Sequence, residues 1–325
     1  MESLEERYDR TLRALTASPG HRFCAAELRK RAPIDRTELF EKAYAERLEL
    51  KQRELRKIYE ASDENWSQTI FVMYLTVLGD HKNREAFTEL ARRVGYNPIQ
   101  HERASLLSVE ALLLGTSGLL ANYPEDDYIV RLKEEFAHLA HKYDIEPMSP
   151  RRWVLREIRP YNHPAIRLAQ AAVFLSAHES ISNRCLGIET RDELFATFCV
   201  EASDYWRTHD TPGSQSESRR KSIGRDKALV IGINMVAQVQ FAYGRAMGRE
   251  DAYDRLTTFM TSLDAEDNAL VREWVRDGFR PENAQDSQAL LQLSKIYCRE
   301  RRCEKCLLGR KILELAVKTH PAEAK

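Results

Sequence analysis

The sequence has no net charge and no long apolar run. Lysine plus arginine number 50, as do aspartate plus glutamate, so the chain carries no overall charge that would favour nucleic acid or a membrane. The longest apolar run, residues 228–244, is interrupted by Asn234, Gln238 and Gln240 and is shorter than the ~20 residues that span a bilayer. We therefore expect no membrane anchor, and only local clusters of charge can indicate a partner.

The chain also lacks the short patterns by which many enzymes are recognised. It contains no HExxH pair, no phosphate loop, no dinucleotide fingerprint and no Ser-His-Asp spacing. No repeat with a period of ~20–50 residues is present. The sequence therefore names no reaction, and whether the chain is an enzyme stays open.

No charged-then-apolar leader follows Met1, and this argues against secretion. Six cysteines in a chain of 325 residues are then more consistent with free or metal-bound thiols than with a disulfide framework. We expect the protein to reside in the reducing cytoplasm.

Helical periodicity dominates and no useful run of strand-like alternation occurs, so we predict an all-α fold, an irregular multi-helix array with a C-terminal cysteine loop. Asp35 with Glu38 reads as a capping box that starts a long helix. Residues 226–247 read as a central buried helix, and four prolines make residues 145–164 a connector. We expect residues 1–325 to form a single helical unit, with a subdivision into residues 1–145 and 146–325 as the alternative.

Half of the cysteines lie near the end of the chain. Cys298, Cys303 and Cys306 have the spacing C-x4-C-x2-C, which lets one loop and the start of a helix direct three sulfurs at one point. The residues between them are charged, so burial as small hydrophobic side chains explains these thiols poorly. The pattern favours zinc or an iron–sulfur cluster, with a redox pair or inert thiols as the alternatives.

A fourth ligand would have to come from elsewhere in the chain. The candidates are Cys24, Cys185, Cys199, His209 and His320. Cys185 and Cys199 lie in apolar helical segments and are expected to be core residues. Cys24 follows the helix breakers Pro19 and Gly20, where a thiol can be presented from the end of a loop, so we predict Cys24 as the fourth ligand.

Two clusters of basic residues could contact phosphates. The first surrounds the cysteine loop, and the second lies in and after residues 210–222, which we expect to be a mobile loop from their composition. The clusters comprise Arg299, Arg301, Arg302, Lys305, Arg310 and Lys311, and Arg219, Arg220, Lys221, Arg225 and Lys227. Our first functional hypothesis is a metal-stapled helical module, non-catalytic by itself, that binds an anionic partner, with nucleic acid as the preferred choice.

An enzyme is the alternative from another class. Its pocket would combine His209 as the acid or base with arginines that bind an anionic substrate. The candidate catalytic residues are His209, Arg207, Arg167, Arg159, Glu110 and Asp286. Glu110 lies inside an apolar stretch, so it is either a member of a structural ion pair or a site residue. A third hypothesis, a protein-interaction scaffold, predicts an exposed apolar patch instead.

Several short sequence segments together resemble those of an uncharacterised bacterial family that is catalogued as a domain of unknown function. They are Trp66 with its apolar helix, residues 110–115, 159–170, 205–209, 241–244 and 286–289, and the cysteine loop. Longer members of that family carry a preceding half that resembles PD-(D/E)xK nucleases. The resemblance implies that this chain corresponds to the helical C-terminal portion and that any nuclease-type carboxylates are either lost or encoded in a separate nuclease-like domain, which would then be a candidate partner.

Overall fold

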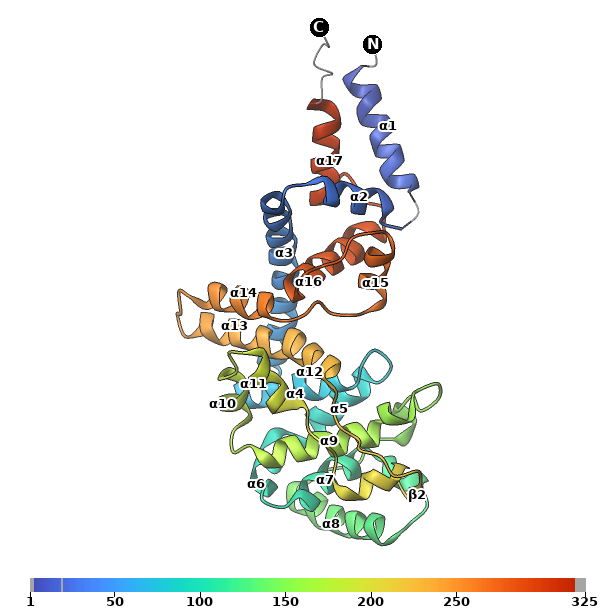
Figure 1. Ribbon diagram of the computed structural model, residues 1–325. Coiled ribbons are helices and arrows are strands. Elements are labelled where there is room, and N and C mark those ends of the chain that lie inside the picture. The colour runs from blue at the N-terminus through green and yellow to red at the C-terminus, as the bar shows by residue number, and fades with distance from the viewer. Residues whose placement is uncertain (1–2, 19, 319–325) are drawn as a thin grey trace. The chain divides into compact units, whose positions relative to one another are not determined.

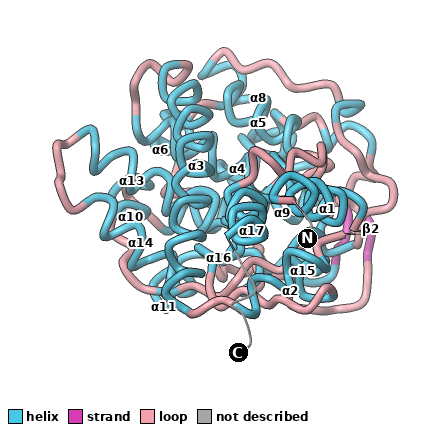
Figure 2. Tube along the Cα trace, turned by 90° about the horizontal axis from the view of Figure 1, so that it is seen from above, coloured by secondary structure: helices cyan, strands magenta, loops and turns pink. Residues whose placement is uncertain are grey.

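The structure, a computed structural model, describes residues 3–18 and 20–318 and consists mainly of helices (Figures 1 and 2). Within that part of the chain the only strands are β1 (His209–Thr211) and β2 (Ser214–Gln215), which form an antiparallel pair. The predicted all-α class is confirmed. None of the described helices is long and apolar enough to cross a membrane.

The chain forms two compact units. One draws on both ends of the sequence, within Met1–Arg53 and Thr257–Lys325, and the other spans Glu54–Leu256. We call them the terminal unit and the central unit. The boundaries fall inside the helices α3 (Pro33–Glu60) and α14 (Ala252–Ser262). Whether the chain folds as one unit or divides near residue 145 stays a prediction.

The central unit contains most of the helices and both strands. In chain order its remaining elements are α4 (Trp66–Leu78), α5 (Arg84–Val94), α6 (Tyr96–Glu102), α7 (Leu106–Thr116), η1 (Leu119–Asn122), α8 (Asp127–Tyr143), η2 (Pro150–Arg152), η3 (Pro160–Asn162), α9 (Pro164–Ala177), α10 (Ile181–Leu186), α11 (Arg191–Phe198), η4 (Asp204–Thr208), α12 (Arg225–Ile231), η5 (Gly232–Val236) and α13 (Ala237–Ala246).

The core of the central unit is built around α7, which packs against α8 and α9 (Figure 1). Every residue from Ser108 to Thr116 is buried, because this segment has few polar side chains and is covered on all sides. Gly115 permits the close approach of α8, since a Cβ atom at this position would lie 2.1 Å from the ring of Phe136. The acid Glu110 is carried into this core by the same helix.

The terminal unit holds the cysteine loop between its last two helical segments. Besides the parts of α3 and α14, its elements are α1 (Leu4–Ala17), α2 (Arg22–Lys30), α15 (Ala269–Arg276), α16 (Ala284–Gln292), the π-helical η6 (Leu293–Cys298) and α17 (Leu307–Lys318). The helix α17 packs against α1 and also contacts α2 (Figure 1). Segments from the two chain ends are therefore neighbours in this unit.

Polar anchors fix α2 and η6 within the terminal unit. The ring of His21, just before α2, stacks on Trp274 at 4.1 Å, and its backbone N–H donates to Asp277 at 2.5 Å. The indole N–H of Trp274 donates to Ser294 Oγ in η6 at 2.8 Å. One tryptophan thus links the segment before Cys24 to the segment that ends at Cys298.

Some sequence predictions need correction. The helix expected to begin with an Asp35 cap begins at Pro33, because proline suits the first helical position. The buried helix expected over residues 226–247 is interrupted by the π-helical η5, and the amide of Gln238 donates to Ile233 O there at 3.2 Å. Residues 210–222 are not an open loop, because they contain the hairpin and a bridge between Glu201 and Ser222.

Candidate metal centre and polar network

The cysteine loop is a tightly hydrogen-bonded segment. Tyr297, at the end of η6, donates its hydroxyl to Glu46 of α3 at 2.8 Å, which fixes the position of the neighbouring Cys298. The chain then turns, with the Arg301 N–H donating to Cys298 O at 3.1 Å and Arg301 at a φ of 52°. The Cys306 N–H donates to Cys303 O at 3.2 Å. The loop backbone therefore has a definite conformation around the three thiols.

Cys306 lies just before the first residue of α17, and its sulfur accepts the backbone N–H groups of Gly309 and Leu308. Burial raises the pKa of Cys306, and these two hydrogen bonds oppose the increase. Donors at a helix start favour the thiolate over the thiol. The first turn of α17 thus partly offsets the effect of burial on this thiol.

Cys24 lies on α2, and the structure places it near the three loop thiols. Burial raises the pKa of Cys24, and the nearby charges of Cys298, Cys306 and Cys303 raise it further. Burial also raises the pKa of Cys298 to about 12, again with contributions from Cys306 and Cys303. All four sulfurs lie within electrostatic range of one another, although no three His, Cys, Asp or Glu side chains of the described residues are arranged so that they could hold a metal ion as they stand.

The other fourth-ligand candidates lie elsewhere. Cys185 is buried, as expected for a core residue, whereas the same prediction for Cys199 is wrong because that side chain is exposed. Both belong to the central unit, as does His209. His320 is outside the described residues.

A polar network in the central unit contains several of the residues expected for an enzyme pocket. Glu110 accepts hydrogen bonds from the hydroxyl of Tyr128 and, at 2.8 Å, from Ser203. Burial raises the pKa of Glu110, and the hydrogen bonds oppose this. No cation of the described residues pairs with the carboxyl group, so hydroxyl donors replace the ion pair that the sequence suggested.

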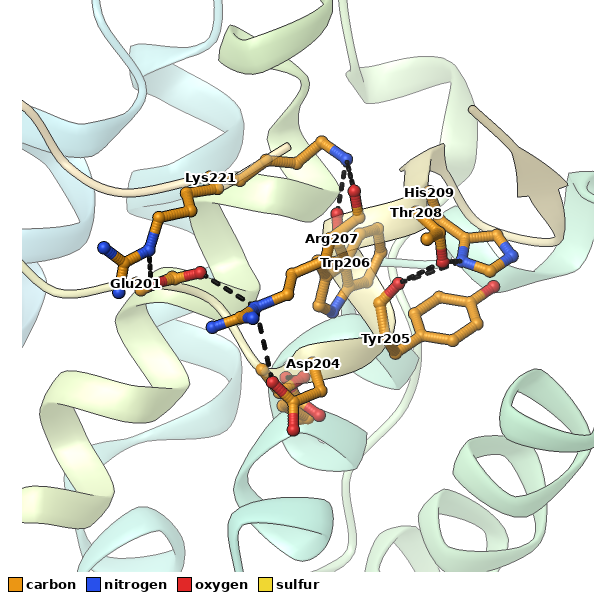
Figure 3. A network of polar contacts seen from close by, with 11 residues as sticks. Glu201, Asp204, Tyr205, Trp206, Arg207, Thr208, His209 and Lys221 are labelled. Atoms are coloured by element: carbon orange, nitrogen blue, oxygen red, sulfur yellow. Dashed lines mark hydrogen bonds and ion pairs between the residues drawn. The ribbon is translucent and has the colours of Figure 1, made fainter. Parts of the chain in front are cut away.

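Tyr205 and His209 form the next part of the network, at η4 and β1 (Figure 3). The Tyr205 ring stacks between those of Tyr128 at 4.0 Å and His209 at 3.9 Å, and its hydroxyl donates to Asp126 at 2.8 Å. His209 Nδ1 lies 2.9 Å from Tyr205 O, and Nε2 lies 3.7 Å from Asp126 Oδ2. Both ring nitrogens therefore face groups of the protein, and this favours a structural role for His209.

Lys221 is the buried cation of this network (Figure 3). Its ammonium group donates to the backbone oxygens of Trp206 and, at 3.2 Å, of Arg207, and it lies 3.3 Å from Asp210. The carbonyl oxygen of Lys221 accepts from Gln170 of α9 at 3.0 Å. Lys221 thus joins η4, the hairpin and α9.

The arginines predicted to bind a substrate are already paired. Arg207 lies 3.1 Å from Glu201 and 3.4 Å from Asp204 (Figure 3). Arg167 donates to Gln170 at 3.0 Å and to Asn162 at 2.6 Å. These contacts leave the two guanidinium groups little capacity to bind an anion.

The remaining pocket candidates are Arg159 and Asp286. Arg159 is exposed at the start of η3. Asp286 belongs to the terminal unit, where it accepts the Glu282 N–H at 3.0 Å near the start of α16. The network thus includes Glu110, Arg207, His209 and Arg167, the last through Gln170.

Sequence reasoning missed Tyr128, Asp126 and His163, and it placed Lys221 in a basic cluster that could contact phosphates, whereas this side chain is buried. His163 accepts the Ala165 N–H at 3.2 Å, and its Nε2 lies 2.9 Å from the Tyr123 hydroxyl. A histidine directly before Pro164, at a helix start, was the available signal for a capping role. No periodicity signals the burial of Lys221, because its segment is rich in charged residues.

Comparison with known proteins gives one family. The family described as "Protein of unknown function (DUF2851)" matches residues 1–269. The matched region includes Cys24 and the polar network and ends before the cysteine loop and residues 286–289. No curated protein matches the chain, and no solved structure matches it.

Proposed function

We propose, on the premise that the chain belongs to the DUF2851 family of proteins of unknown function, that it is a helical module, non-catalytic by itself, that binds an anionic partner. The partner class we propose is nucleic acid. The contact surface consists of the basic residues around the cysteine loop, which we call the loop cluster: Arg299, Arg301, Arg302, Lys305, Arg310 and Lys311.

The observation that carries this proposal is that the side chains of the loop cluster are exposed and, in the described part of the chain, largely without ion pairs. All six side chains are exposed, and among the described residues the only ion pair within this cluster joins Arg302 to Glu300. The ordered loop and the first turns of α17 present these charges together. Exposed cations on an ordered backbone suit phosphate groups, since phosphates supply the sequence-independent part of nucleic-acid affinity.

The second basic cluster has a different environment. Arg219 pairs with Asp210 at 2.6 Å, Arg220 with Glu201 at 3.0 Å and Lys227 with Asp80 at 2.5 Å. Lys221 is buried. These contacts neutralise most of the cluster, with Arg225 the exposed exception, so we assign the anion contact to the loop cluster.

The enzyme hypothesis receives no comparable support. Arg207 and Arg167 are paired, and His209 directs both ring nitrogens at protein groups. The scaffold hypothesis needs an apolar patch, but the most exposed large apolar side chains, Ile34, Met247 and Leu4, come from separate segments. Neither the paired arginines and His209 nor the separate apolar side chains favour a second function.

The family resemblance supports one further part of this proposal, and the cysteines support another. A module without its own reaction would serve a separate nuclease-like domain, which would carry the chemistry on nucleic acid. The six free cysteines suit a reducing compartment, so we propose the cytoplasm as the location.

The test is binding to short single-stranded and duplex DNA, measured by fluorescence anisotropy from ~50 to 200 mM salt. We expect affinity to fall steeply as salt rises, because each phosphate contact releases counterions. The variant Arg299→Gln/Arg310→Gln removes two exposed charges of the loop cluster. It should lower the slope of log K against log salt by about two, since each phosphate contact contributes about 0.9 for duplex DNA.

The matched control is Arg219→Gln/Arg220→Gln, which removes the same number of arginines from the internally paired cluster. It should bind DNA as the unmodified protein does. Equal losses in the two double variants would show that only overall charge matters. Absence of binding at ~50 mM salt would remove nucleic acid as the partner.

A further inference from the structure

We propose that Cys24, Cys298, Cys303 and Cys306 form one metal centre that takes zinc or an iron–sulfur cluster through four thiolates. The centre would join α2 to the cysteine loop within the terminal unit. This inference does not depend on the proposed binding of nucleic acid, because it concerns different atoms and has its own readout.

The turn from Cys303 into α17 is shaped like one that holds a ligating sulfur. The Cys306 sulfur accepts two N–H groups of the first turn of α17, from Leu308 and Gly309. Position 309 has no room for a side chain, since a Cβ atom there would lie 2.1 Å from Cys303 O, and glycine occupies it. Two cysteines with two residues between them are thereby brought onto one turn, with backbone donors directed at a sulfur.

Cys24 approaches from the opposite end of the chain. The stacking of His21 on Trp274 and the hydrogen bond from Trp274 to Ser294 connect α2 to η6, the segment that ends at Cys298. The helix α2 also contacts α17, which begins directly after Cys306. Cys24 therefore lies within electrostatic range of the three loop cysteines, which are far from it in the sequence, while Cys185 and Cys199 belong to the central unit.

The four side chains are not arranged for ligation as they stand, so metal binding requires them to move. Each thiol releases its proton as its sulfur bonds to the metal, and no bond to carbon is made or broken. Four thiolates with Zn²⁺, or with a [4Fe–4S]²⁺ cluster, carry a net charge of 2−.

The experiment is elemental analysis together with absorption spectroscopy of the full chain purified without oxygen. Stoichiometric zinc in a colourless protein identifies a zinc site, and a brown protein that absorbs at about 400 nm with bound iron and sulfide identifies a cluster. Both results support the proposal. A protein with neither metal after expression in medium supplemented with zinc and iron overturns it.

The variants Cys24→Ser and Cys303→Ser should each lose most of the bound metal, whereas Cys199→Ser, at an exposed cysteine outside the group, should keep all of it. Circular dichroism checks that each variant remains helical. Full metal content in Cys24→Ser shows that Cys24 is not a ligand and overturns the four-thiol centre.

Thiol alkylation followed by peptide mass spectrometry gives a readout that needs no variant. In the metal-containing protein, Cys24, Cys298, Cys303 and Cys306 should be protected together and become reactive together after chelation. Cys199 should react at once in both states. Protection of the loop thiols that persists unchanged after complete removal of metal overturns the proposal.

Discussion

At the scale of single residues, His163 has contacts that require the neutral ring. Its Nδ1 accepts the Ala165 N–H, so that nitrogen carries no proton, and Nε2 faces the Tyr123 hydroxyl. Burial lowers the pKa of His163 from 6.5 to about 4, and nearby Asp210 opposes this change. Between those two pH values the unfolded chain holds a proton that the folded chain lacks.

His163 should therefore contribute stability above pH 6.5 that is lost as the pH falls toward 4. Between pH 7.5 and pH 5 the loss should be about 2 kcal/mol, at 1.36 kcal/mol for each pKa unit. The variant His163→Asn keeps a capping side chain and has no titrating group, so it should lack this part of the pH dependence. Urea unfolding at both pH values measures the difference, and equal pH dependence in the two proteins would contradict this role.

The contribution of Glu110 to stability changes with pH in the opposite direction to that of His163. Burial raises the pKa of its carboxyl group above 4.5, so the folded chain holds a proton that the unfolded chain has released. The stability due to this group is present below pH 4.5 and is lost as the pH rises through the folded pKa. Glu110→Gln should therefore gain stability relative to the unmodified protein between pH 4.5 and pH 7.5, as measured by denaturant unfolding.

Glu110→Ala provides the comparison, because it removes the acceptor for Tyr128 and Ser203. We expect it to be about 2 kcal/mol less stable than Glu110→Gln at both pH values. A glutamine variant that loses stability as the alanine variant does would show that the carboxylate, and not the hydrogen-bond acceptor, is required.

At the scale of elements, the start of α17 depends on its close approach to Cys303. In Gly309→Ala the new methyl group would lie 2.1 Å from Cys303 O, so the helix and the loop must separate. We expect a loss of about 1–3 kcal/mol, which is typical of overpacking, together with weaker metal retention. Thermal unfolding and elemental analysis measure the two effects.

Gly224→Ala is the control for this substitution. Gly224 precedes α12 at a φ of −76°, and no atom lies within 4 Å of the position that a Cβ atom would occupy there. Its replacement should change stability by less than about 0.5 kcal/mol, as at most surface positions. If Gly309→Ala is equally mild, the loop does not depend on the contact with Cys303.

At the scale of the whole molecule, ligation by Cys24 and Cys298 would close a loop of about 270 residues. By analogy with disulfides, restricting so long an unfolded chain stabilises the folded state by about 5 kcal/mol. Chelation should lower the melting temperature, and Cys24→Ser should lower it nearly as much as Cys303→Ser does. Differential scanning calorimetry measures these changes, with Cys199→Ser as the unchanged reference.

Chelation is applied to unmodified protein that has been shown to contain metal. It separates the effect of losing the metal on the melting temperature from any local disturbance caused by a serine substitution. An unchanged melting temperature would mean that the metal does not link folding at the two chain ends.

Local sequence determined the helical class, most helix ends and the cysteine loop, because periodicity, caps and spacing act within a few residues. Asn65, Asp126 and Thr190 each cap the helix that they precede, for this reason. Only the tertiary structure decided which side chains are paired. Arg219 and Arg299 look alike in the sequence, yet Asp210 binds the first and no described acid forms an ion pair with the second. Likewise Cys199 is exposed and Cys24 lies within electrostatic range of Cys298, because burial and proximity depend on how distant helices pack.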